Sequence, residues 1–134
     1  MPSFTRINLL EQDDFVAGRA QGVEGRFGRT ALGTSDVGVS HFRYAPEFVA
    51  TTGHRHREQE EVYVIVAGSG RMLIDGEVID VAQWDAIRLA PKAVRAFAAG
   101  SDGLEVIAVG GPKPEGGDGE PVPVEWPGTA PSAD

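Results

Sequence analysis

The sequence contains no cysteine, only three histidines and only two lysines among its 134 residues. Without cysteine, the chain cannot form a disulfide scaffold or bind zinc or an iron–sulfur cluster through thiolates. Its formal net charge is −8, which argues against nucleic-acid binding because that function needs a basic face. A hydrophobic content of 41% is ordinary for a globular protein, and the length predicts one domain.

Long hydrophobic runs are missing as well. No stretch approaches the ~20 apolar residues of a membrane span, and the first residues do not form an apolar targeting segment. We therefore expect a cytoplasmic protein that contacts no membrane. The glycines of the sequence G-x-x-G-x-x-G at residues 22–28 are not followed by a phosphate-binding lysine, so no nucleotide cofactor is predicted.

The last 25 residues, 110–134, differ in composition from the rest of the chain. They contain six of the nine prolines, six of the eighteen glycines and half of the net charge. This composition predicts an irregular Pro/Gly-rich acidic tail after a body that spans residues 1–109. Because Val122, Val124 and Trp126 alternate, two interpretations stay open: a solvated tail, or a short stretch that packs on the body or on a partner subunit.

Residues 37–109 consist of short β-prone segments separated by turn residues. We expect strands at residues 37–44, 61–66, 71–74, 77–81, 86–89, 93–97 and 104–109. Asp75-Gly76 predicts a type I′ hairpin turn, in which both central residues need positive φ. Residues 8–36 are less regular, with a short helix at 9–16 and one or two edge strands. The pattern predicts an all-β sandwich or barrel.

One cluster contains residues suited to metal chemistry. His54 and His56 are two positions apart, so a strand would place both on the same face. A carboxylate from Glu60 or Glu61 would complete a set of two imidazoles and one carboxylate. Such a set suits non-haem iron and can also hold zinc, manganese or nickel. The alternative from these residues alone is a solvated, charged turn.

The context of these histidines resembles the first motif of the cupin superfamily, G-x5-H-x-H-x3,4-E-x6-G. Here the motif is His54-x-His56-x4-Glu61-x6-Gly68, with Phe48 at the position of the opening glycine. The resemblance covers residues 37–109. It implies a double-stranded β-helix, or jelly-roll, barrel that is often a homodimer and has its site inside the barrel. It also implies that Glu61 is the metal-binding carboxylate.

The second cupin motif, G-x5-P-x-G-x2-H-x3-N, is not preserved. Its five keyed positions hold Trp84, Ala90, Lys92, Arg95 and Ala99. Arg95 therefore stands where the resemblance places a third histidine ligand, and a guanidinium has no lone pair to donate. In one interpretation His54, His56 and Glu61 hold a metal, and Arg95 binds an anionic substrate. In the other, Arg95 replaces the metal and pairs with Glu61.

We therefore expect a barrel that binds a small, anionic molecule around His54, His56, Glu61 and Arg95. Tyr63 and Phe97 would line the cavity or belong to the ordinary core. As an enzyme, the protein would resemble metal-dependent cupin oxygenases or isomerases with iron, manganese, nickel or zinc. The alternatives are a non-catalytic, metal-free cupin that binds or senses a metabolite, and an acid–base enzyme that uses one of the histidines.

Overall fold

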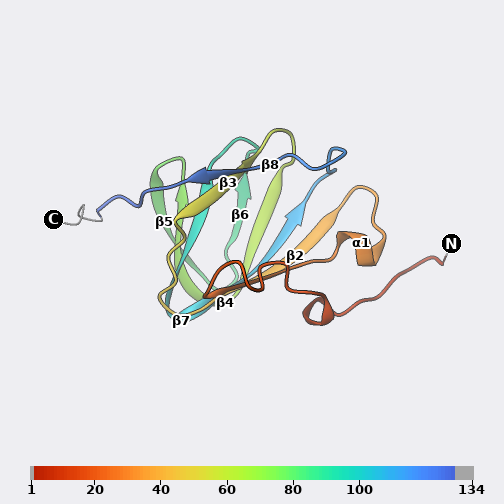
Figure 1. Cartoon of the computed structure of the whole chain (residues 1–134), viewed down its shortest axis with the longest axis horizontal. Helices are drawn as coiled ribbons and strands as arrows, with labels where there is room; N and C mark the ends of the chain where they lie inside the picture. Colours follow the sequence, from red (N-terminus) through yellow and green to blue (C-terminus); the bar gives the residue numbers. More distant parts are fainter. Residues whose placement is uncertain (1, 129–134) are drawn as a thin grey trace.

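The computed structural model describes residues 2–128, and its regular secondary structure is almost entirely β-strand (Figure 1). The strands are β1 (Val23–Phe27), β2 (Gly38–Tyr44), β3 (Thr52–His56), β4 (Glu61–Ile74), β5 (Glu77–Ala82), β6 (Ala86–Leu89), β7 (Arg95–Gly110) and β8 (Gly119–Pro123). The helices are η1 (Leu9–Glu11) and α1 (Arg29–Leu32), so the helix expected at 9–16 is a single 3₁₀ turn. Within residues 2–128, neither helix has the length or apolar character to cross a membrane.

The eight strands form one antiparallel sheet that curls on itself, which confirms the predicted all-β barrel. The hydrogen-bonded order is β1-β2-β7-β3-β8, and β4 pairs with β5, β6 and β7. The second half of β7 lies between β2 and β4, whereas its first residue, Arg95, pairs with His54 of β3. This pairing brings the two segments of the cupin resemblance side by side.

Two long strands each join segments that the sequence predicts as separate strands. In β4, the expected strands 61–66 and 71–74 are continuous, with β-bulges before and after Gly68. Gly68 has a φ of 77°, and a side chain there would collide with the carbonyl of Gly103. A glycine thus lets the strand bend without ending it. β7 joins the last two expected strands in the same way.

Left-handed backbone conformations occur in the turns on either side of β5. Asp75 and Gly76 have φ values of 49° and 84°, and Ile74 pairs with Glu77, which confirms the predicted hairpin. Trp84, between β5 and β6, has a φ of 73°, although only glycine adopts this region readily. Its side chain is 70% exposed, so it does not pack within the chain.

The core has two parts on opposite faces of the sheet. The larger cluster fills the barrel and contains Tyr63, Ile65, Met72, Val81, Leu89, Ala93, Phe97, Ala99, Leu104, Val106 and Ala108. The smaller cluster, which contains Leu73, Ala96, Ala98 and Trp126, lies on the other face of β7, because successive side chains of a strand alternate. Trp126 is 6% exposed, and its Nε1–H donates to the carbonyl of Ala50 at 2.8 Å.

The C-terminal segment contributes this second cluster and a strand. The predicted boundary after residue 109 falls one residue before the end of β7, and β8 pairs with all of β3 (Figure 1). The segment is irregular on both sides of β8, and the stretch with alternating apolar residues packs on the body. Residues 129–134 of the predicted tail lie outside the described residues. Pro121 and Pro123 have no N–H to offer a further strand, which protects this edge of the sheet.

Candidate functional site

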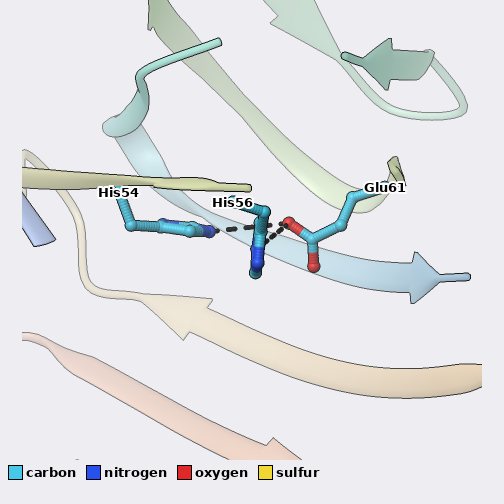
Figure 2. A group of neighbouring side chains, drawn as sticks. All are labelled: His54, His56 and Glu61. Atoms are coloured by element: carbon cyan, nitrogen blue, oxygen red, sulfur yellow. Dashed lines mark hydrogen bonds and ion pairs between the residues drawn. The ribbon is translucent and has the colours of Figure 1, made fainter. Parts of the chain in front are cut away.

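The two histidines and the glutamate of the first motif converge on one point (Figure 2). His54 and His56 project from the same face of β3, and Glu61 is the first residue of β4. Glu61 Oε1 lies 3.2 Å from His56 Nε2 and 3.5 Å from His54 Nε2. The three potential ligand atoms lie within 4.8 Å of one another. The sequence therefore predicts this cluster correctly, and metal binding by it stays a prediction.

Tyr63 is the fourth polar side chain of the cluster. Its hydroxyl donates to Glu61 Oε1 at 2.7 Å and lies 3.3 Å from His54 Nε2. Burial raises the pKa of Glu61, but hydrogen bonds from the two histidines and from Tyr63 outweigh burial and lower that pKa well below its usual range. Burial and the neighbouring Glu61 charge raise the pKa of Tyr63. At neutral pH the pair is thus a carboxylate and a neutral phenol.

Asp118 is a site residue that the sequence analysis missed. Its Oδ1 lies 2.9 Å from His56 Nδ1, and its Oδ2 accepts the backbone N–H groups of Glu58 and Gln59 at 2.6 and 2.9 Å. These two bonds hold the turn that returns the chain from His56 to Glu61. Asp118 follows Glu61 by more than fifty residues and lies in the predicted tail, so no motif spacing points to it.

The contacts of Asp118 set the electrostatics of His56. Burial raises the pKa of Asp118, but its hydrogen bonds with Glu58, Gln59 and His56 outweigh burial and lower the pKa to about 2. The hydrogen bond with Glu61 raises the pKa of His56 and, together with the bond to Asp118, outweighs burial. When His56 is protonated, Nδ1–H donates to Asp118 and Nε2–H donates to Glu61 Oε1.

Arg95 contacts Glu61 from within the protein. Its side chain has no exposed surface, and Nη1 donates to the carbonyls of Pro91 and Ala93 at 3.1 and 2.7 Å. Nη2 lies 3.4 Å from Glu61 Oε1. Within residues 2–128, Nε and Nη2 have no hydrogen-bond acceptor. The positive charge of Arg95 therefore lies next to the negative charge of Glu61. Direct contact between Arg95 and a ligand stays a prediction.

A pocket of about 420 Å³ opens onto the cluster. Its lining contains four polar cluster residues, three phenylalanines, two cations and the acid of the C-terminal segment: His54, His56, Glu61, Tyr63, Phe15, Phe27, Phe42, Arg29, Lys113 and Asp118. Tyr63 lines this pocket, as predicted. Phe97 does not, but lines a second cavity of about 340 Å³ that also borders His54 and Arg95. A cavity of about 530 Å³ contains none of the predicted site residues.

The donor set fits a divalent metal ion. Two imidazoles and one carboxylate leave coordination positions open, and a carboxylate on the second nitrogen of a ligating histidine is a common supporting contact. The His56–Asp118 bond supplies that contact. The buried Arg95 charge repels a second cation beside Glu61. The ligands therefore suit a metal ion, but this repulsion weakens its binding.

Solved structures with the same architecture identify the fold. A cupin protein from Bacteroides fragilis superposes with a TM-score of 0.68 and 22% identity, covering 84% of this chain and 86% of that chain. The chain has the cupin fold. The polyketide cyclase RemF from Streptomyces resistomycificus also shares this cupin barrel, with a TM-score of 0.66 and 18% identity over 80% of this chain and 78% of that chain.

Larger cupin proteins contain the same barrel. A variant of the oxalate decarboxylase OxdC from Bacillus subtilis superposes with a TM-score of 0.67 and 18% identity, covering 79% of this chain but 29% of that chain. No protein-family model matches the chain, and no curated protein matches its sequence. The solved neighbours thus include enzymes, and the likeness to them shows the fold.

Proposed function

We propose that this cupin binds a small molecule in the 420 Å³ pocket and holds a divalent metal ion with His54, His56 and Glu61. The observation that carries the proposal is the hydrogen bond between His56 and Asp118, a residue outside both cupin motifs. A carboxylate in this position keeps the imidazole oriented and makes its other nitrogen a better ligand. Iron, manganese, nickel and zinc all suit the donor set.

The residues around the cluster prepare it for chemistry on a bound molecule. A metal ion held there would supply Lewis acidity. Tyr63 donates to Glu61 and fixes the carboxylate, and its high pKa keeps the phenol protonated. The phenylalanines of the lining give the pocket one apolar wall. This arrangement supports an oxygenase- or isomerase-like activity, as the cupin resemblance implies.

A metal-free binding protein is the second candidate, and the contact between Arg95 and Glu61 favours it. The buried guanidinium neutralises the carboxylate that a metal would otherwise use. In this form the pocket would bind or sense a metabolite without catalysing a reaction. The two candidates differ in one measurable property, which is the affinity of the cluster for a divalent cation.

A cobalt titration separates these candidates. Chelator-stripped protein titrated with Co²⁺ should develop visible absorption bands that saturate at one equivalent, because Co²⁺ reports its nitrogen and oxygen ligands. His56→Ala and Glu61→Gln should each abolish saturation. His41→Gln is the matched control, because His41 contacts Glu105 and is not in the pocket lining. Absence of saturable binding in the wild-type protein would favour the metal-free candidate.

Two further predictions concern the state of the protein in the cell. A homodimer would place the exposed Trp84 indole in a subunit contact, and light scattering of wild-type protein and Trp84→Ala tests this expectation. A cytoplasmic location remains a prediction.

A further inference from the structure

We infer that the pocket selects an aromatic carboxylate, that is, a molecule with a flat aromatic body and one carboxylate group. This inference rests on the proposed binding pocket and names the chemical class of its ligand. It is carried by side chains outside both cupin motifs: Phe15, Phe27, Arg29 and Lys113.

The apolar wall of the pocket is aromatic. Phe15 stacks on Phe27, with ring centroids 4.0 Å apart and an angle of 3° between planes, and Phe42 meets Phe15 edge-on at 6.0 Å. Phe27 is 57% exposed, so much of its surface is open to further contacts. Flat, rigid side chains favour stacking or edge-on contact with an aromatic body over contact with a flexible alkyl chain.

The space beside this wall comes from small residues on β2. Gly38, Ser40 and Phe42 alternate along the strand and all line the pocket. Gly38 makes room for the guanidinium of Arg29, which a side chain at this position would displace. Ser40 has a small side chain, so the middle of β2 leaves room for a ligand next to the phenylalanines. The volume of about 420 Å³ lies within the range of pockets that enclose small organic molecules.

Two cations border the same pocket. Arg29 Nη2 donates to the carbonyl of Gly111 at 2.8 Å, a neutral acceptor that orients the guanidinium without cancelling its charge. Lys113 is exposed two residues further along the same segment. The two carboxylates of the lining, Glu61 and Asp118, are held by histidines and other donors. A ligand carboxylate can therefore pair with these cations, and Arg29 offers a two-pronged hydrogen-bond partner.

The C-terminal segment connects this cationic border to the cluster. It begins at Gly111, which accepts from Arg29 and from Gln59, and reaches Asp118, which holds His56. Arg29 and Lys113 thus provide the carboxylate contact, while His54, His56 and Glu61 face a polar group on the ring.

Isothermal titration with three probes tests the chemical class. 2-Naphthoate has both features, 2-naphthalenemethanol lacks the charge, and decanoate lacks the ring. We expect 2-naphthoate to bind at least about fivefold more tightly than either other probe, because each lacks one of the two contacts. Equal binding of the alcohol overturns the role of the cations. Equal binding of decanoate overturns the aromatic preference, and no binding of 2-naphthoate at millimolar concentration overturns the inference.

A pair of lysine variants tests the residue assignment. Lys113→Gln should weaken 2-naphthoate binding about fivefold and leave 2-naphthalenemethanol binding unchanged. Lys92→Gln is the matched control, because Lys92 is equally exposed but lies outside the pocket lining. Equal losses in the two variants would contradict the assignment. Lys113 is exposed, so its replacement should not disturb folding.

Each titration is repeated after treatment with a chelator, so that the inference and the metal proposal fail separately. Discrimination among the probes by a protein that binds no metal supports the ligand class and contradicts the metal site. A protein that binds metal but does not distinguish the probes contradicts the ligand class alone.

Discussion

Asp118 Oδ1 lies 2.9 Å from His56 Nδ1, so an acid from the C-terminal segment orients a histidine of the first cupin motif. The same carboxylate accepts two backbone N–H groups from the turn between β3 and β4. Asp118 is 3% exposed and therefore fixed in place by its own burial. The segment that composition marks as a tail thus supports the centre of the barrel.

Replacement of Asp118 tests this support. Asp118→Asn should weaken the binding of Co²⁺ or Zn²⁺ about 10- to 100-fold, because a neutral amide no longer holds the His56 ring with the same strength. Competition with a chromogenic chelator measures the affinity, and far-UV circular dichroism checks the fold. Asp80→Asn is the control, because Asp80 is an exposed residue of β5. Unchanged affinity in Asp118→Asn would show that the ring needs no support.

Arg95 should have opposite effects on stability and on metal affinity. Arg95→Met removes the buried cation beside Glu61, so we expect the metal-free protein to lose about 3 kcal/mol of unfolding free energy. The same change removes the repulsion of a second cation and should raise the metal affinity roughly tenfold. Urea denaturation and chelator competition measure the two quantities.

Arg95→Lys serves as the control for charge, since it keeps a cation near Glu61 and should leave the metal affinity within about threefold of the wild-type value. If Arg95→Met lowers the metal affinity instead, Arg95 does not oppose the metal, and its contact with Glu61 has another role.

The features that the sequence predicts correctly depend on residues that lie close together in the chain. The spacing of His54, His56 and Glu61 is local, because the alternation of a strand and one short turn bring the three together. The Asp75-Gly76 hairpin is local in the same sense. Motif spacing and turn chemistry therefore predicted the proximity of these three side chains and one turn correctly.

The remaining features depend on contacts between distant segments. Asp118 meets His56 only because β8 pairs with β3, and Arg29 meets Gly111 because β2 pairs with β7. Composition measures how much apolar surface a segment can bury by itself, so it predicted a tail where a neighbouring strand supplies the missing partner. The sequence also predicted two separate strands in place of each of β4 and β7, because a glycine commonly ends a strand. In β4, Gly68 instead lets the strand bend and continue.

The two tryptophans should respond oppositely to replacement. Trp126→Ala removes a buried indole and its hydrogen bond to Ala50, so we expect a loss of about 3–5 kcal/mol in unfolding free energy. Trp84→Gly relieves a left-handed backbone and sacrifices little burial within the chain, so we expect a gain of about 0.5–1 kcal/mol for the monomer. Urea denaturation followed by circular dichroism measures both. A stable Trp126→Ala variant would contradict the structural role of the C-terminal segment.

The pair of His41 and Glu105 should make stability depend on pH. Burial raises the pKa of Glu105, but the hydrogen bond from His41 and the charge of Arg43 outweigh burial and lower that pKa. Because folding lowers the pKa of Glu105, its charge stabilises the fold at pH values above the pKa that Glu105 has in the unfolded chain. This stabilisation is lost as the pH falls through the pKa of Glu105 in the folded protein. Glu24 also contacts Arg43 and shares its charge.

Glu105→Gln should therefore reduce the unfolding free energy by about 1 kcal/mol at pH 7, with a smaller difference below about pH 4. Urea denaturation at pH 7, 5 and 3.5 measures the difference, and Glu77→Gln, at an exposed position of β5, is the control. A difference that stays constant over this range would show that the Glu105 charge contributes nothing.

The metal site is tested most directly by the metal content of the protein as it is isolated. The chain should be expressed without a histidine tag, purified without added metal or nickel resin, and analysed by mass spectrometry of the elements. We predict close to one equivalent of a first-row divalent metal in the wild-type protein and less than about a tenth of an equivalent in His56→Ala. Less than about a tenth of an equivalent in the wild-type protein would contradict the metal site and leave Arg95 as the cation that neutralises Glu61.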